Sequence, residues 1–310
     1  MTIFQFKQQA IKELKASAIN SVTLSPSLDV DIIISHFLKM TKTEILMNNK
    51  KELNDEQLEI LNKALASRLT GLPIAYITNE KEFYGYSFYV NPDVLIPKPD
   101  TEILVEEAVN VILEKMDARG DSLLTVCDMC TGSGCIALSV FRSLIDQYDI
   151  PISQMPKFTL VDISSKALDI ARKNAASLLS HEELSHISFI QSNLFHDVPF
   201  TFDVILTNPP YVPHSMVKEL LQDGRSEPAL ALDGDITLSG DMANNDDGLE
   251  IIRNLIPQGY SQLTPSDGIM IMETGEYNAV EAAMIGHNNS FETDIIKDLE
   301  GQLRVVEFYK

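Results

Sequence analysis

The chain has 310 residues, enough for one large domain or, as we expect, a large domain and a small one. Apolar residues make up 45% of it, so a sizeable core can form. Acidic residues outnumber basic ones by 45 to 24, and the formal net charge is −21. Such a chain would be repelled by nucleic acid phosphates, which favours a basic protein partner over a nucleic acid. An acidic surface that serves only solubility is an equal alternative.

Neither export nor a membrane span is predicted. No apolar run approaches the roughly 18 residues that a span needs, and residues 1–7 lack the apolar stretch of a signal peptide. The cysteines, Cys127, Cys130 and Cys135, lie close together, but there is no second cysteine pair and no His-x-x-x-His pattern. Small buried thiols are therefore favoured over a zinc or redox site. We expect a monomeric cytoplasmic protein without a metal ion.

Residues 1–75 predict a small helical domain. Apolar residues recur at helical spacing from Ile3 to Leu14 and again over residues 28–38. A third helix is predicted to begin at Asn54, a good N-cap followed by acids, and to stop before Gly71. Aromatic residues on both sides of Gly85 predict a β-hairpin, and residues 76–97 form the predicted linker.

Residues 98–310 alternate between helical and strand patterns. Helices are predicted over residues 101–116, from 136, over 164–178, 247–260 and 276–285, and strands over 123–128, 158–162, 187–191, 202–208, 268–273 and 304–308. This alternation predicts an α/β, Rossmann-like domain whose parallel sheet is covered by helices on both faces. The polar residues 235–245 predict a mobile surface loop without regular structure.

The run Thr131-Gly132-Ser133-Gly134 joins a predicted strand to a helix and is typical of nucleotide-binding turns. A tight turn that uses glycine only for its geometry is the alternative. The next strand ends at Asp162-Ile163, where a carboxylate can accept both hydroxyls of a ribose or can serve as an acid at a helix start. Asp128, before the loop, would repel a pyrophosphate and attract a sulfonium or an amine. This charge favours S-adenosylmethionine over NAD.

The tetrapeptide Asn208-Pro209-Pro210-Tyr211 follows a strand that the sequence predicts to be buried. Asn208 offers a side-chain carbonyl, and Pro209, without an N–H, offers its backbone carbonyl. Two acceptors that converge on one NH2 group define a site that reads a donor, and Tyr211 adds a face for stacking. The alternative is a Pro-Pro turn in which Asn208 bonds its own backbone.

These features resemble the N5-glutamine methyltransferases that modify peptide chain release factors, the HemK/PrmC type. The resemblance covers nearly the whole chain and includes, besides the runs above, residues 76–77, 82–85, 94–102, 227–228, 231–234 and 297–301. It implies S-adenosylmethionine as cofactor and, as substrate, the glutamine of the Gly-Gly-Gln loop in class I release factors. It also implies that Asn193 and Leu194 lie against the adenine. The predicted cofactor-binding residues are Asp128, Cys130, Thr131, Gly132, Ser133, Gly134, Asp162, Ile163, Asn193, Leu194 and Asn208. The predicted catalytic residues are Asn208, Pro209, Pro210 and Tyr211.

Several positions depart from the family pattern. Cys130 stands where a glycine is usual, and a cysteine there is strained if the position needs a positive φ. Lys98 replaces an arginine and cannot make the same forked contact. Asn193 replaces an aspartate, residues 273–278 only approximate a Glu-x-Gly-x-x-Gln pattern, and residues 235–245 look inserted.

The predicted mechanism holds an amide nitrogen, a poor nucleophile, in line with the cofactor's methyl group. Asn208 and Pro209 accept hydrogen bonds from its NH2 group, and the proton leaves afterwards, so neither a general base nor a metal is required. The alternatives are an adenine amino-methyltransferase acting on nucleic acid, which needs a basic face, a glutamine methyltransferase acting on a ribosomal protein, and a noncatalytic cofactor-binding protein. The N-terminal helices are predicted to recognise the partner, and bracing of the hairpin is the alternative.

Overall fold

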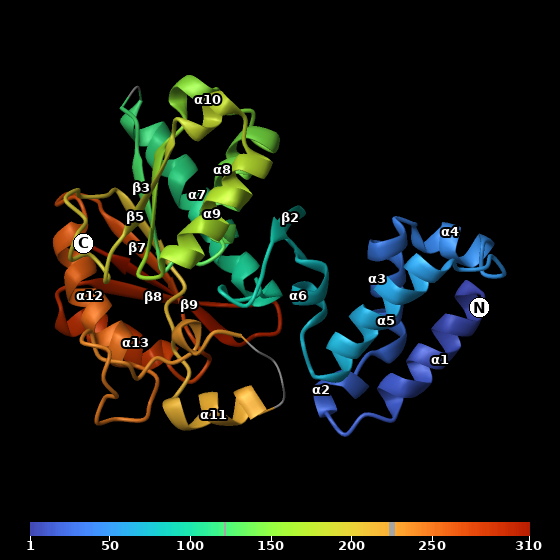
Figure 1. Ribbon diagram of the computed structural model, residues 1–310. Helices are drawn as coiled ribbons and strands as arrows, with labels where there is room; N and C mark the ends of the chain where they lie inside the picture. Colours follow the sequence, from blue (N-terminus) through green and yellow to red (C-terminus); the bar gives the residue numbers. More distant parts are fainter. Residues whose placement is uncertain (121, 223–226) are drawn as a thin grey trace. The chain divides into compact units, whose positions relative to one another are not determined.

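The computed structural model describes residues 1–120, 122–222 and 227–310 (Figure 1). The chain divides into two compact units. The first is Met1–Glu80 with the described part of Lys218–Glu227, and the second is Lys81–Val217 with Pro228–Lys310. None of the helices in the described residues is long and apolar enough to cross a membrane.

The first unit is helical, as predicted. It contains α1 (Ile3–Lys15), α2 (Asn20–Thr23), α3 (Pro26–Leu38), α4 (Lys42–Met47), α5 (Asp55–Leu69) and α6 (Ile74–Thr78). The predicted N-cap is confirmed, since Asn54 and Gln57 cap the start of α5 reciprocally through their side chains. The apolar faces meet in one core, formed chiefly by Ile3, Phe6, Leu14, Val30, Ile33, Ile34, Leu61 and Leu65. A buried ion pair between Arg68 and Asp29, at 2.7 Å, adds to it.

The predicted hairpin is present. Strands β1 (Glu80–Phe83) and β2 (Tyr86–Tyr89) form a two-stranded sheet. Tyr84 and Gly85 join them with φ angles of 51° and 78°. Positive φ at both central residues gives the turn twist that suits a two-residue hairpin, which explains the glycine.

A seven-stranded sheet forms the centre of the second unit, in the order β5-β4-β3-β6-β7-β9-β8. Its strands are β3 (Thr125–Met129), β4 (Lys157–Asp162), β5 (Ile187–Gln191), β6 (Val204–Thr207), β7 (Ile269–Glu273), β8 (Glu292–Lys297) and β9 (Leu303–Tyr309). Pairing is parallel from β5 to β7, as predicted, but β9 runs antiparallel to both β7 and β8. The predicted parallel sheet is thus confirmed over β5 to β7, and its edge at β9 and β8 is antiparallel. The sequence did not predict β8 because its residues Glu292–Lys297 are mostly polar and stay partly exposed.

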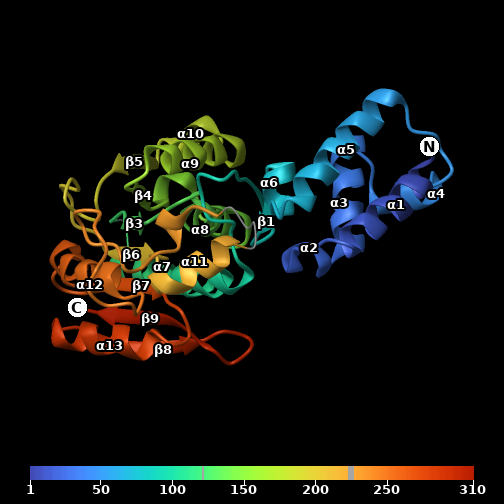
Figure 2. The same ribbon diagram turned by 60° about the horizontal axis from the view of Figure 1, so that its bottom comes forward.

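Helices cover both faces of this sheet. Helices α7 (Glu102–Arg119), α8 (Cys135–Asp146) and α9 (Ser165–Leu178) pack on one face, and α12 (Glu250–Gln262) and α13 (Ala279–Asn288) pack on the other (Figure 2). Along β6, Val204 and Leu206 enter one core, while Ile205 enters the other. Burial on both faces explains why the central strands are almost wholly apolar. Shorter described elements are α10 (His181–Leu184), α11 (His214–Gln222), and the single turns η1 (Pro99–Thr101), η2 (Ile152–Gln154) and η3 (Ala229–Ala231).

Candidate active site

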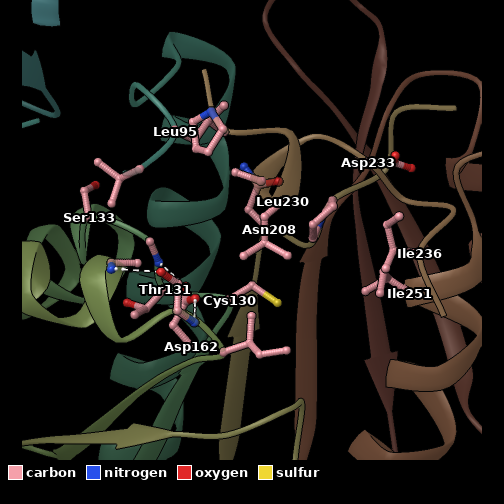
Figure 3. Close-up of a pocket in the computed structure, with 18 of the residues that line it drawn as sticks. Leu95, Cys130, Thr131, Ser133, Asp162, Asn208, Leu230, Asp233, Ile236 and Ile251 are labelled. Atoms are coloured by element: carbon pink, nitrogen blue, oxygen red, sulfur yellow. Dashed lines mark hydrogen bonds between the residues drawn. The ribbon is translucent and has the colours of Figure 1, made fainter. Parts of the chain in front are cut away.

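The carboxyl ends of β3, β4 and β6 meet at one edge of the sheet, and the residues that follow them line a pocket of about 300 Å³ (Figure 3). Ligands of doubly wound sheets bind at this edge. The pocket brings together ten of the predicted site residues, namely Cys130, Thr131, Gly132, Ser133, Asp162, Ile163, Asn193, Leu194, Asn208 and Pro210. Asp128, Gly134, Pro209 and Tyr211 are not among the lining residues.

The two glycines of the loop have different surroundings. Gly132 has a φ of 54°, and a side chain added there would meet nothing within 4 Å, so the backbone stays open to a ligand. Gly134 has a φ of 80°, and an added Cβ would lie 3.2 Å from Leu138 Cδ1 and 3.3 Å from Ala171 Cβ. Gly134 therefore lets α8 pack closely, and only Gly132 leaves room for a ligand.

Cys130 has a φ of 60°, in the left-handed region that side chains avoid. The position does have a positive φ, so the cysteine adopts a strained backbone conformation that suits glycine. Its side chain lines the pocket beside Asn208 (Figure 3). Burial, the largest cause, and the nearby carboxylates of Asp162 and Asp128 raise the pKa of the thiol, which keeps it neutral.

We expect Cys130→Gly to leave the unfolding temperature unchanged or to raise it by about 1–3 °C, because relief of roughly 1 kcal/mol of strain offsets the freer unfolded chain. Cys127→Gly is the matched control. Cys127 lies fully buried in β3, so the same substitution removes packing from a strand and should lower the unfolding temperature by roughly 5 °C or more. Thermal unfolding followed by circular dichroism measures both. Equal losses would show that the conformation of Cys130 is not strained.

Asp162 connects the glycine loop to the second helix of the nucleotide-binding half. Its Oδ2 accepts from the backbone N–H of Gly132 at 2.9 Å, and its Oδ1 accepts from that of Ser164 at 2.9 Å. Burial raises the pKa of this carboxyl, and the backbone hydrogen bonds partly oppose the shift. Asp162 thus fixes the loop while it lines the pocket. It accepts from the N-cap residue of α9, Ser164, but lies outside the first turn of that helix.

Asp128 lies beneath the loop and is fully buried. Its Oδ2 accepts from Thr131 Oγ1 at 2.6 Å and from the N–H of Ala137 at 3.3 Å. Burial raises the pKa of its carboxyl to about 7, and these hydrogen bonds oppose the rise. The structure thus gives Asp128 a bracing position behind the pocket wall, where a direct contact with a cationic ligand was expected.

The tetrapeptide follows β6 directly. Asn208 Nδ2 donates to the hydroxyl of Thr101 at 3.3 Å, which leaves the side-chain oxygen without a hydrogen bond to the described residues. In the alternative of a simple Pro-Pro turn, Asn208 would bond its own backbone, and the observed partner is instead the Thr101 side chain. The Tyr211 hydroxyl donates to Glu273 Oε1 at 3.3 Å, and burial, reinforced by the charge of Glu273, raises the pKa of that tyrosine. Asn208 and Tyr211 are therefore both held from outside the tetrapeptide.

The prediction of a mobile surface loop over residues 235–245 was wrong at its start. Asp235 is 1% exposed, and its carboxylate accepts from the N–H groups of Gly248 and His214 at 2.8 Å and 3.1 Å. Residues 236–240 then line the pocket. Asn193 Nδ2 donates to the Leu238 carbonyl at 2.7 Å, a bond that an aspartate, as an acceptor, could not make. Two of the departures from the family pattern thus contact each other.

Several lining residues were not predicted as site residues. The segment before α7 contributes Asp93, Val94, Leu95, Pro97, Lys98 and Thr101, and the segment around η3 contributes Pro228, Leu230, Ala231 and Asp233. Most fall in runs 94–102, 227–228 and 231–234 that carry the resemblance, so their place in a motif was the available signal. Their sequence distance from the glycine loop gave no indication of contact.

The fold and the pocket define a methyltransferase, since a Rossmann-like sheet presents a glycine loop, an acid after the next strand and Asn-Pro-Pro-Tyr at one edge. The sequence matches the family described as PrmC N-terminal domain over residues 5–78 and the methyltransferase small domain over residues 103–238.

Relatives extend this match to nearly the whole chain. A release factor glutamine methyltransferase of Rhodopirellula baltica is 34% identical over 92% of this chain and 90% of that protein. One of Leptospira interrogans is 37% identical over 67% of this chain and 68% of its own. A bifunctional methyltransferase of Rickettsia conorii is 32% identical over 97% of this chain, which spans only 58% of that longer protein. The chain belongs to the release factor glutamine methyltransferase family.

Proposed function

We propose that this protein transfers a methyl group from S-adenosylmethionine to the side-chain nitrogen of the glutamine in the Gly-Gly-Gln motif of class I release factors. One observation carries the proposal. Asn208 lines the pocket next to the glycine loop, and its amide nitrogen is engaged by Thr101, so the oxygen is the end available to a ligand. An acceptor at that place suits a substrate NH2 group.

The residues of the pocket fit S-adenosylmethionine. Gly132 leaves its backbone open, and Asp162 offers a carboxylate for ribose hydroxyls. The charged residues of the lining are three carboxylates, Asp93, Asp162 and Asp233, and one lysine, Lys98. This excess of negative charge favours a ligand with positive charge. Cys130, Thr131, Ser133, Ile163, Asn193 and Leu194 would complete the cofactor contacts, with Asp128 and Gly134 supporting the loop from behind.

The bound cofactor supplies an electrophilic methyl group on a sulfonium. The protein's task is then to hold the weakly nucleophilic amide nitrogen. Asn208 Oδ1 and the Pro209 carbonyl accept from the substrate NH2 group, which directs its nitrogen and supports the positive charge that develops there. Such positioning can lower a barrier by about 7–11 kcal/mol. Pro210 lines the pocket beside Asn208. The Tyr211 ring, held through its hydroxyl by Glu273, does not line the pocket, and we propose that it stacks on the planar amide when the substrate is bound.

The helical residues 1–75 are proposed as the recognition domain, residues 76–97 as the hairpin linker and residues 98–310 as the methyltransferase domain. The net charge of −21 suits a partner with a basic surface, and the proposal assigns that surface to the release factor. The first unit has strongly exposed apolar side chains, among them Leu24 and Met47 at 81% and 80%, which suits a protein-binding surface. The same proposal implies a monomeric enzyme of the cytoplasm.

Removal of residues 1–71 is expected to weaken binding to a release factor at least about tenfold while the affinity for S-adenosylmethionine stays within about twofold. The affinity for S-adenosylmethionine should be kept because all residues that line the pocket lie between positions 93 and 251. Titration calorimetry with each ligand measures both affinities. A truncated protein that binds the release factor as tightly as the full chain would exclude the recognition role.

The proposed function is tested by incubating the protein with methyl-labelled S-adenosylmethionine and a panel of class I release factors, ribosomal proteins and DNA. Mass spectrometry then maps the labelled atom. We expect the label on the release factor alone, at the Gly-Gly-Gln glutamine. Label on a ribosomal protein or on adenine would support one of the alternatives and overturn the proposal.

A further inference from the structure

A chain of buried polar groups lies behind Asn208. Thr101, at the end of η1, is 2% exposed and accepts from Asn208 Nδ2 at 3.3 Å. Glu273, the last residue of β7, is 1% exposed and accepts from the Tyr211 hydroxyl through Oε1. Its other oxygen, Oε2, is buried without a hydrogen-bond partner among the described residues. Thr101 also interacts with this carboxyl and lowers its pKa.

The two ends of the Asn208 side chain have the same shape and opposite hydrogen-bonding capacity. Only the oxygen can accept from an NH2 group, and the nitrogen would repel it. A rotation of half a turn about the last side-chain bond exchanges the two ends without changing the packing. A neighbouring group must therefore select the end that the substrate meets.

Thr101 can make that selection only if its own hydroxyl hydrogen is committed elsewhere. A hydroxyl has one hydrogen to donate and two lone pairs to accept with. An ionised carboxylate is an acceptor only, and the Oε2 atom of Glu273 has no other partner among the described residues. A charged Glu273 beside Thr101 would take the hydroxyl hydrogen and leave the Thr101 oxygen to accept. The Thr101 oxygen then pairs with the nitrogen of Asn208, as the structure has it.

We propose that Thr101 and Glu273 are positioning residues that set the orientation of the Asn208 amide, with ionised Glu273 fixing the Thr101 hydroxyl so that Asn208 presents its oxygen to the methyl-accepting glutamine. The inference rests on the proposed function. Neither residue needs to touch the reacting atoms, because both act through Asn208. A protonated Glu273 reverses the direction of these hydrogen bonds. It donates to Thr101, and the Thr101 hydroxyl hydrogen then points to the Asn208 oxygen.

The groups that face Glu273 determine when this reversal occurs. Tyr211 donates to it, Thr101 lies beside it and lowers its pKa, Arg304 of β9 attracts the charge, and Asp100 of η1 repels it. The neutral thiol of Cys135, at the start of α8, lies near it. Arg304 is shared, since it also pairs with Asp298 at 3.2 Å and with Asp100 at 3.5 Å. Burial outweighs the attractive contacts and raises the pKa of Glu273 to about 7. The orientation in which the Asn208 oxygen faces the substrate is thus favoured above about pH 7 and lost below it.

The test compares Thr101→Val, which keeps the shape and removes the hydroxyl, with Thr101→Ser, which keeps the hydroxyl. Rates of methyl transfer to a release factor are measured with saturating cofactor from about pH 6 to about pH 9. This range lies on both sides of the raised pKa of Glu273. We expect kcat of Thr101→Val to fall about tenfold at high pH and that of Thr101→Ser to stay within about threefold of wild type. The wild-type kcat should rise about tenfold between about pH 6 and about pH 8, because a carboxyl with a pKa of about 7 goes from about one-tenth to about nine-tenths ionised over that range. Glu273→Gln should be slow without this rise.

Calorimetric titration with S-adenosylmethionine reports whether each variant is folded, and the Thr101 pair decides the matter even if Glu273→Gln does not fold. A Thr101→Val enzyme with wild-type kcat at every pH, a Thr101→Ser enzyme as slow as Thr101→Val, or an unchanged pH profile in folded Glu273→Gln would each overturn the inference alone. A wild-type protein that methylates no glutamine would overturn the proposed function, and the inference with it.

Discussion

Replacing Asn208 with alanine is expected to lower kcat for methyl transfer by about 10³-fold or more, while S-adenosylmethionine still binds. The substitution removes the acceptor that would hold the substrate nitrogen, and the glycine loop and Asp162 stay intact because neither bonds to Asn208. Single-turnover rates with a release factor measure the first effect, and calorimetric titration with the cofactor measures the second.

Asn254→Ala is the matched control for this variant. Asn254 lies in α12, its side chain donates to Glu250 of the same helix, and it does not line the pocket. Its removal should leave kcat within about twofold of wild type, since surface substitutions are nearly neutral. Turnover by Asn208→Ala close to that of the control would end the account of the tetrapeptide as the site that reads the NH2 group.

A release factor whose Gly-Gly-Gln glutamine is replaced by glutamate is expected to be methylated on the order of 10⁴-fold more slowly than the natural substrate. A carboxylate has no NH2 group to donate, so the acceptors offered by Asn208 and Pro209 would stay unpaired. The charge would also be repelled by a pocket that contains Asp93 and Asp162. Competition between the two release factors for one limiting enzyme, with masses of the products read separately, measures this ratio.

Asparagine at the same substrate position serves as the comparison, because it keeps the NH2 group on a shorter side chain. It should react faster than glutamate, although more slowly than glutamine. Equal rates for glutamine and glutamate would mean that the enzyme recognises the shape of the loop and does not read the donor.

Much of the fold could be predicted because each central strand is buried on both faces and each helix follows the period of its apolar residues. The strands β3, β4, β5, β6 and β7 all fall where the sequence predicts them. Edge strand β8 was missed because most of its residues are polar, which gives it little apolar signal, and because its pairing with β9 cannot be seen in the local sequence. The antiparallel edge therefore appeared only in the structure.

The candidate site was predictable where its residues are contiguous. The loop of residues 131–134 and the tetrapeptide carry their chemistry in short runs, and the strain at Cys130 followed once its φ angle was known. Contacts across many residues were not predictable. The bond from Asn193 to Leu238 joins positions 45 apart, and that from Asn208 to Thr101 joins positions 107 apart. Burial of Asp128 was missed for another reason: its charge suggested exposure to a ligand, although its partners Thr131 and Ala137 are only 3 and 9 positions away.

The central claim is that a substrate carboxamide is held by two acceptors at the end of β6. A crystal structure of the protein with S-adenosylhomocysteine and a release factor tests it most directly. We predict that the glutamine nitrogen lies about 2.7–3.2 Å from both the Asn208 side-chain oxygen and the Pro209 carbonyl. A glutamine nitrogen turned away from Asn208, or bound to other groups, would contradict the account.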